Sequence, residues 1–261
     1  MIKAKKSLGQ NFLIDQNIID KIVNILELKN RNILEVGPGT GNLTEGILKK
    51  NPKKVIVIEK DNYLANLMKN KFKNRIKVIN QDILKTNENN LSDQILTVFG
   101  NLPYNISTQI LINWILNIKE KTWFDCLILM FQKEVADRII SNFNSKSYGR
   151  LTIMANWRFN IKKICDVKPV SFQPRPKIES SILFFEPKKN FISFKNPKNL
   201  EKITRVFFMH RRKMIKKPYY QLFNKDVSIA SKIGIKLNLR PQNLNFETYF
   251  ELTKEYESLR S

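Results

Sequence analysis

The feature that most constrains this fold is a series of four short apolar runs, of which the first leads into a glycine-rich turn and the other three end in polar or acidic residues. The runs are Asn32–Val36, Val55–Glu59, Lys77–Asp82 and Thr97–Asn101, and stretches with helical spacing or composition, such as Leu43–Lys50 and Asn62–Lys71, lie between them. This alternation of strands and helices predicts an α/β fold with a parallel sheet covered on both faces. Strands buried on both faces are expected to be apolar almost throughout, as Ile33-Leu34 and Val55–Ile58 are.

The pattern continues beyond the fourth run. A helix is expected from about Ser107 to Lys119, followed by a fifth strand at Cys126–Phe131. Two further β-like segments, Leu151–Phe159 and Ser180–Phe185, are separated by the proline-rich region Pro169–Pro176. We expect these two segments to complete the sheet as an antiparallel hairpin.

The character of the chain changes after Glu186 and Pro187, where the sequence becomes helix-forming and strongly basic. Between Lys188 and Gln221 there are eleven Lys or Arg residues and one acid, Glu201. The sequence therefore predicts two domains, residues 1–187 with the α/β sheet and residues 188–261 as a small α-helical domain.

The net charge favours a polyanionic partner. Lys and Arg total 46 of 261 residues against 23 for Asp and Glu, a formal charge of +23, and such a field attracts nucleic acid. The alternative is an A/T-rich genome, which enriches Lys, Asn and Ile whatever the function. Clustering of the charge is therefore stronger evidence than its total.

Other classes of protein are disfavoured by composition. Cys126 and Cys165 lie far apart, and His210 is the single histidine, so no metal site and no oxidising compartment are expected. No segment approaches the roughly 20 apolar residues of a membrane helix. We expect a cytoplasmic protein that does not bind membranes.

A glycine-rich turn follows the first strand directly. Gly37, Gly39 and Gly41 let the backbone turn tightly and approach a ligand at the first strand-to-helix connection. Such a turn serves NAD, FAD or S-adenosylmethionine. A dinucleotide fingerprint has its third glycine at position six, where this chain has Asn42, and the G-x-G-x-G spacing resembles the loop of methyltransferases.

Two acidic residues follow at the ends of the next strands. Glu59 is placed to accept hydrogen bonds from ribose hydroxyls, and Asp82 from an adenine amino group. Either acid alone could merely cap a helix or face solvent. Together with the glycine turn they predict a pocket for an adenosine-containing cofactor, S-adenosylmethionine.

The fourth strand ends in the tetrapeptide Asn101-Leu102-Pro103-Tyr104, which resembles the N/D-P-P-Y motif of methyltransferases that act on base amino groups. The Asn101 side-chain oxygen and the Leu102 carbonyl can accept hydrogen bonds from an adenine amine and aim its lone pair. Pro103 fixes the backbone, and Tyr104 offers an aromatic face for an extruded base. The alternative is an ordinary strand-to-turn exit.

Further segments resemble the KsgA-type small-subunit ribosomal RNA adenine dimethyltransferases over nearly the whole chain. They are Leu8–Leu13, Asn101–Thr108, Phe131–Ala136, Lys146–Leu151 and Phe172–Lys177. The resemblance implies a Rossmann-like class I methyltransferase sheet with a small C-terminal α-helical domain. It also implies that Asn11 and Leu13 join Gly37, Gly39, Gly41, Glu59, Asp82 and Asn101 as contacts of the cofactor. Phe172 would be a second stacking wall for the adenine, unless it is a core side chain.

The implied substrate is a pair of adjacent adenosines in a hairpin near the 3′ end of small-subunit rRNA. The resemblance also implies that the partner is an assembling small ribosomal subunit and that the protein is a monomer. Arg211, Arg212, Lys213 and Lys216 would place cations on one side of a helix for phosphate contact, although any single lysine could be only solvated. Pro218 departs from the family pattern and is expected to break or bend that helix.

Three other readings stay open. Relatives that methylate large-subunit rRNA and confer macrolide resistance share the fold and a similar tetrapeptide. A non-catalytic ribosome assembly factor could keep the fold, although the residues of the predicted site are intact. A nicotinamide oxidoreductase is disfavoured by Asn42 and by the tetrapeptide.

Overall fold

The computed structural model describes residues 4–5, 8–118 and 122–260. The strands are β1 (Phe12–Leu13), β2 (Asn32–Val36), β3 (Lys54–Glu59), β4 (Lys77–Asn80), β5 (Leu96–Asn101), β6 (Phe124–Gln132), β7 (Phe159–Val167), β8 (Phe172–Gln173) and β9 (Ser180–Pro187). The helices are α1 (Gln16–Val23), α2 (Asn42–Leu48), α3 (Asn62–Phe72), α4 (Ser107–Asn117), α5 (Lys133–Ile139), α6 (Arg150–Arg158), α7 (Lys198–Phe208), α8 (Lys216–Phe223), α9 (Val227–Ile233) and α10 (Phe246–Ser258). No helix in the described part of the chain has the length and apolar character that crossing a membrane requires.

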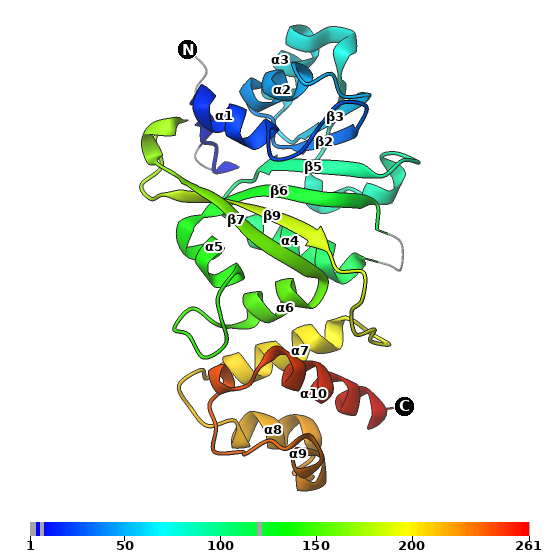
Figure 1. Ribbon diagram of the computed structural model, residues 1–261, viewed down its shortest axis with the longest axis vertical. Coiled ribbons are helices and arrows are strands. Elements are labelled where there is room, and N and C mark those ends of the chain that lie inside the picture. Colours follow the sequence, from blue (N-terminus) through cyan, green and yellow to red (C-terminus); the bar gives the residue numbers. More distant parts are fainter. Residues whose placement is uncertain (1–3, 6–7, 119–121, 261) are drawn as a thin grey trace. The chain divides into compact units, whose positions relative to one another are not determined.

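The main sheet has the strand order β4-β3-β2-β5-β6-β9-β7 (Figure 1). Neighbouring strands from β4 to β6 are parallel, and β9 runs antiparallel to β6. The parallel arrangement brings the carboxyl ends of β2, β3, β4 and β5 to one edge, which is where open α/β sheets bind ligands. A separate pair of short strands, β1 and β8, is antiparallel.

Alternate residues of the central strands form one apolar core with α1, α2 and α3. Ile33, Val57 and Phe99 from the sheet pack with residues such as Ile19 and Ile47 from the helices. The intervening residues of the strands, such as Leu34, Ile56 and Val98, are also buried. Both faces of the sheet are therefore covered, which explains why these strands are apolar almost throughout.

The strands and helices expected before residue 132 are confirmed with small shifts at their ends. β2 has the predicted limits, and β3, β5 and β6 each begin one or two residues early. α4 ends at Asn117, and its predicted end, Lys119, lies outside the described residues. The predicted strand at Ser180–Phe185 is β9.

The predicted strand at Leu151–Phe159 is wrong, because this segment forms helix α6. The Thr152 hydroxyl accepts a hydrogen bond from the backbone N–H of Gly149 at the start of the helix, at 3.0 Å. Residues 152–155 and 157–158 are all buried. A helix buried on almost every side shows no 3.6-residue period, so its apolar run resembles a buried strand.

The strand beside β9 is instead β7, which the sequence did not reveal. It lies at the end of the strand order and carries exposed polar residues, such as Asn160 and Lys162. Charged side chains are usual on an edge strand, where they discourage pairing with other chains. They also hide the apolar alternation by which a strand is recognised.

The contacts within the chain divide it into two compact units. One unit comprises Met1–Ala136 and Ile161–Pro187, and the other comprises Asp137–Asn160 and Lys188–Ser261. The predicted boundary at residue 188 is one of these division points. Residues 137–160 group with the second unit, where Arg150 of α6 pairs with Glu201 of α7 at 2.5 Å.

The prediction of one basic helix around residues 207–217 is also wrong. α7 ends at Phe208 and α8 begins at Lys216, so Arg211, Arg212 and Lys213 lie in the connection between two helices. Pro218 is the third residue of α8, within the first turn, where a missing N–H costs no helical hydrogen bond. The interruption therefore precedes Pro218.

The turn between β2 and α2 depends on a glycine at position 41. The φ angle of Gly41 is +82°, and a Cβ there would lie 2.6 Å from the Phe72 ring and 2.9 Å from the sulfur of Met68. Gly37 also has a positive φ, of +70°, but its nearest neighbour would be the Asn101 carbonyl oxygen at 3.5 Å. Of Gly37 and Gly41, only Gly41 combines a positive φ angle with a steric clash at an added Cβ.

We expect Gly41→Ala to lower the free energy of unfolding by more than about 2 kcal/mol, because strain and overpacking add. Gly37→Ala, the matched control, carries only the cost of its φ angle, about 1 kcal/mol. Urea unfolding of both variants measures the difference. Equal losses would show that α3 yields to the added methyl group.

Candidate functional site

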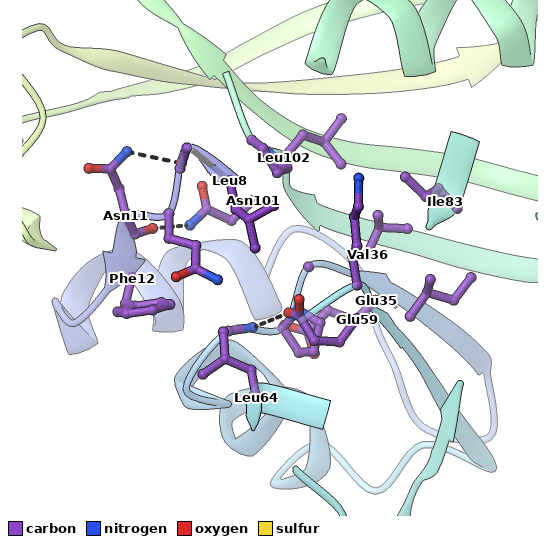
Figure 2. Close-up of a pocket in the computed structure, with 18 of the residues that line it drawn as sticks. Leu8, Asn11, Phe12, Glu35, Val36, Glu59, Leu64, Ile83, Asn101 and Leu102 are labelled. Atoms are coloured by element: carbon purple, nitrogen blue, oxygen red, sulfur yellow. Dashed lines mark hydrogen bonds between the residues drawn. The ribbon is translucent and has the colours of Figure 1, made fainter. Parts of the chain in front are cut away.

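A large cavity opens at the carboxyl edge of the parallel strands (Figure 2). Its walls come from an N-terminal arm, residues 8–13, the β2–α2 turn, the ends of β3 and β4, and the segment that follows β5. The empty volume is about 1070 Å³, counting the solvent at the mouth. Its place at this edge of the sheet is the one expected of a cofactor site.

The glycine turn and the tetrapeptide meet in this one cavity. Gly37 lies beside Asn101, because the parallel strands β2 and β5 pair with Val36 opposite Gly100. Gly37, Gly39, Asn101, Leu102, Pro103 and Tyr104 all line the wall. A cofactor on the turn and a substrate at the tetrapeptide would therefore share the same space.

Glu59, the last residue of β3, is tied to the glycine turn. Its carboxylate accepts hydrogen bonds from the backbone N–H groups of Gly39, at 3.4 Å, and Asp61, at 2.8 Å. Burial raises the pKa of Glu59, and these two hydrogen bonds oppose that shift. The side chain lines the cavity, as the sequence predicted for an acceptor of ribose hydroxyls.

Asp82 lies after β4 and also lines the cavity. Its carboxylate pairs with the ammonium group of Lys60 at 2.8 Å and accepts a hydrogen bond from the N–H of Leu84 at 3.0 Å. The contact with Lys60 lowers the pKa of Asp82 despite some desolvation. Asp82 is therefore held at the cavity wall as a hydrogen-bond acceptor, and its contact with an adenine amino group stays a prediction.

A third acid on the wall, Glu35, was missed by the sequence analysis. Glu35 is 1% exposed in β2, and the hydroxyl of Thr44 donates to its Oε2 at 2.5 Å. Burial raises its pKa to about 7, the hydrogen bond from Thr44 opposes the shift, and the charge of Glu59 adds to it. An acid inside an apolar strand just before a glycine turn was the available signal.

These buried carboxylates give the cavity a chemistry opposite to that of the whole chain. Glu35 and Glu59 line it close enough for their charges to interact, although the chain carries a net charge of +23. Buried carboxylates stay ionised most easily beside a cation. A cation in the cavity would therefore stabilise the ionised forms of Glu35 and Glu59, and S-adenosylmethionine carries positive charge.

Asn101 and Leu102 line the cavity and carry two oxygen acceptors, the side-chain Oδ1 and a backbone carbonyl. The side-chain amino group of Asn101 donates to the backbone carbonyl of Asn11 at 2.9 Å, which leaves Oδ1 as the free end of the amide (Figure 2). Within the described residues, neither Asn101 Oδ1 nor the Leu102 carbonyl receives a hydrogen bond. Both oxygens can therefore accept from an amine.

Tyr104 is half-buried and lines the cavity. A residue far from the tetrapeptide in sequence holds its hydroxyl. The hydroxyl shares a hydrogen bond of 2.5 Å with Ser180, which is fully buried at the start of β9. Burial raises the pKa of Tyr104. This second anchor fixes the direction of the ring and was not predicted, since only the fold brings residues 104 and 180 together.

The arm residues predicted by resemblance, Asn11 and Leu13, both line the cavity. Phe172 is not among the lining residues, and its role as a stacking wall stays a prediction. The Phe172 side chain is 1% exposed and belongs to the same core as Leu13. The two residues lie opposite each other, Leu13 in β1 and Phe172 in β8. This packing favours the alternative that Phe172 is a core side chain.

Gly41 is also absent from the wall, since it faces Phe72 and Met68 of α3. Its role in this structure is to shape the turn.

The cations predicted to contact RNA lie together in the second unit. Arg212, Lys213 and Lys216 are exposed. Arg211 is half-buried, and its guanidinium donates to the Gln242 side chain at 3.2 Å and to the Ser145 carbonyl at 3.1 Å. Arg211 is therefore engaged within the protein.

Comparison with known proteins points in one direction. A family model described as ribosomal RNA adenine dimethylase matches residues 1–258. The chain is 63% identical to ribosomal RNA small subunit methyltransferase A of Pelagibacter ubique, covering 99% of both chains. The enzyme of the same name from a Wolbachia strain of Drosophila simulans is 39% identical, over 99% of this chain and 96% of the relative.

Solved structures agree on the fold. A dimethyladenosine transferase from Plasmodium falciparum superposes with a TM-score of 0.78 at 26% identity, covering 95% of this chain and 98% of that one. The 23S rRNA methyltransferase ErmE gives a TM-score of 0.70 at 22% identity, covering 95% and 100%. The second likeness concerns the fold alone.

The buried Glu35 predicts a pH dependence of stability. With a pKa near 4.5 unfolded and about 7 folded, the folded state keeps its proton longer as pH rises, so the free energy of unfolding falls between these values. We expect the wild type to lose roughly 3 kcal/mol relative to Glu35→Gln between pH 4.5 and 8. Urea unfolding across this range, with the exposed Glu27→Gln as control, measures it. A constant difference would contradict the assignment.

Proposed function

On the premise that this chain belongs to the ribosomal RNA adenine dimethylase family, we propose that it dimethylates the N6 amines of two adjacent adenosines in a hairpin near the 3′ end of small-subunit rRNA. The methyl donor is S-adenosylmethionine. The names of the two relatives described above support the choice of subunit. The observation that carries the proposal is the meeting of the glycine turn and the tetrapeptide in one cavity.

Residues of the first unit would hold the cofactor. The backbone of Gly37 and Gly39 provides close approach, Glu59 accepts from the ribose hydroxyls, and Asp82 accepts from the adenine amino group. Asn11 and Leu13 of the arm cover the same space. When bound, the cofactor supplies a methyl group already activated on a sulfonium.

The task left to the protein is to aim a weak nucleophile. The lone pair of an adenine amine is delocalised into the ring, so the amine must be held in a geometry that frees it. Asn101 Oδ1 and the Leu102 carbonyl accept its two hydrogens and turn the lone pair away from them. A monomethylated amine keeps one hydrogen for these acceptors, which allows a second transfer.

Tyr104 would stack on the extruded adenine. A base must leave its helix before its amino group can reach a buried site, and an aromatic face compensates for the lost stacking. The bond from Tyr104 to Ser180 holds the ring ready before RNA arrives. Pro103 sets the backbone between the acceptors and the ring.

The second unit would bind the rRNA backbone. Arg212, Lys213 and Lys216 are exposed cations available for phosphates, whereas Arg211 supports the connection that contains Arg212 and Lys213. We further propose that the partner is an assembling small ribosomal subunit, and that the protein acts in the cytoplasm as a monomer.

One assay tests the substrate. Labelled S-adenosylmethionine is supplied with unmodified small or large ribosomal subunits, and the labelled nucleotides are mapped. We expect dimethylation of two adjacent adenosines of small-subunit RNA. Label on large-subunit RNA alone would support the macrolide-resistance type of enzyme, and no label on either would support a non-catalytic assembly factor.

Asn101→Ala tests the catalytic tetrapeptide. Loss of one acceptor for the amine should lower the rate of methyl transfer by about a hundredfold or more, while cofactor affinity changes by less than about tenfold. Rapid-quench single-turnover experiments measure the rate of methyl transfer, and isothermal titration calorimetry measures the affinity for the cofactor. Asn66→Ala, on the exposed face of α3, is the control. Unchanged turnover by Asn101→Ala would refute the assigned role.

The RNA surface is tested by salt dependence. Replacing Arg212, Lys213 and Lys216 by Gln should weaken binding of an rRNA fragment and reduce the slope of log K against log salt by about two to three. A variant with Gln at the exposed Lys225, Lys236 and Lys254 has the same net charge and should keep most of the slope. Equal slopes in the two variants would indicate only a bulk charge effect.

A further inference from the structure

We propose that the N-terminal arm and the catalytic asparagine lock each other: the Asn101 amino group fastens the closed arm, and the arm fixes Asn101 Oδ1 as the end that meets the substrate. Asn42 is the positioning residue that holds the arm on its other side. This inference deepens the proposed function and rests on it for the identity of the amine.

The arm lies between two motifs that are far apart in sequence. At one side the side chain of Asn42, from the glycine turn, donates to the Leu13 carbonyl at 2.7 Å. At the other, Asn101 donates to the Asn11 carbonyl at 2.9 Å (Figure 2). The arm is thus fastened by one residue from each half of the site.

Further contacts press the arm onto the turn that would hold the cofactor. A Cβ on Gly39 would lie 2.7 Å from the Phe12 ring, so the arm and the turn are already in close contact. Gln10 donates to the Asp61 carboxylate at 3.2 Å. An arm packed this closely cannot move without breaking the bond to Asn101.

The polarity of the amide makes the coupling directional. A carboxamide has a donor end and an acceptor end, whereas a backbone carbonyl only accepts. The Asn11 carbonyl therefore selects the amino end of Asn101 and leaves Oδ1 for the amine. If the amide flipped, oxygen would face oxygen at the arm, and donors would face a substrate that is itself a donor.

This arrangement explains two choices in the sequence. Asn42 occupies the position at which a dinucleotide fingerprint has its third glycine, and here its amino group reaches Leu13. At position 101 the wider class of amine methyltransferases has Asn or Asp. An Asp at 101 would keep an acceptor for the amine but would direct a carboxylate oxygen at the Asn11 carbonyl and open the arm.

Amide hydrogen exchange of the arm, in the whole protein without RNA, tests the lock. We expect exchange within residues 8–13 to be about five- to tenfold faster in both Asn101→Asp and Asn42→Ala, because each loses one hydrogen bond of the closed state. Asn66→Asp makes the same chemical change on an exposed face and should exchange as the wild type does. Unchanged arm exchange in both variants, or equal acceleration in Asn66→Asp, would overturn the proposal.

Kinetics separate positioning from a merely structural role. At saturating cofactor, Asn42→Ala should lower kcat about five- to tenfold and leave the KM for RNA unchanged. In an Asn101→Ala background the same change should cost nothing further, because no amide remains to be oriented. An equal loss in both backgrounds would contradict the coupling. If the wild type methylates no rRNA, the proposed function fails, whereas the exchange result still decides whether the arm is locked.

Discussion

The parallel pairing of β2 with β5 is the constraint on which the whole site depends. It sets Val36 opposite Gly100, so the glycine turn that follows one strand lies against the tetrapeptide that follows the other. Because both strands are buried on both faces, a slip in register would exchange the side chains packed on the two faces and disrupt the close packing of both. The core thus fixes the distance between the place for a methyl donor and the place for an amine.

The acids that line the cavity differ in sign of charge from the chain as a whole. Most of the chain is basic, as binding to RNA requires, yet the cavity is lined by buried carboxylates, Glu35 and Glu59. Both acids have raised pKa values because burial disfavours their charge. A cationic cofactor would lower the free-energy cost of keeping these buried carboxylates ionised. This gain would add to the affinity of the site for such a cofactor.

Most of the fold was predictable from the sequence because apolar periodicity and motif spacing are local signals. The Rossmann-like methyltransferase sheet and the small C-terminal helical domain are confirmed, as are the strand ends that carry Glu59 and Asn101. Local signals failed in α6, where burial on almost every side hides the helical period. They also failed in β7, where exposed polar residues hide the alternation of a strand. Nor did they reveal the roles of Ser180 and Asn42, which depend on partners distant in sequence.

The central claim is that an adenine amine is held by two oxygen acceptors inside the cavity that holds the methyl donor. A crystal structure of the protein with S-adenosylhomocysteine and a short adenosine-containing RNA hairpin tests this directly. The account predicts the adenine N6 at about 2.7–3.2 Å from both Asn101 Oδ1 and the Leu102 carbonyl oxygen, with the ring on Tyr104. An amine bound by other residues, or a cofactor in a different pocket, would contradict it.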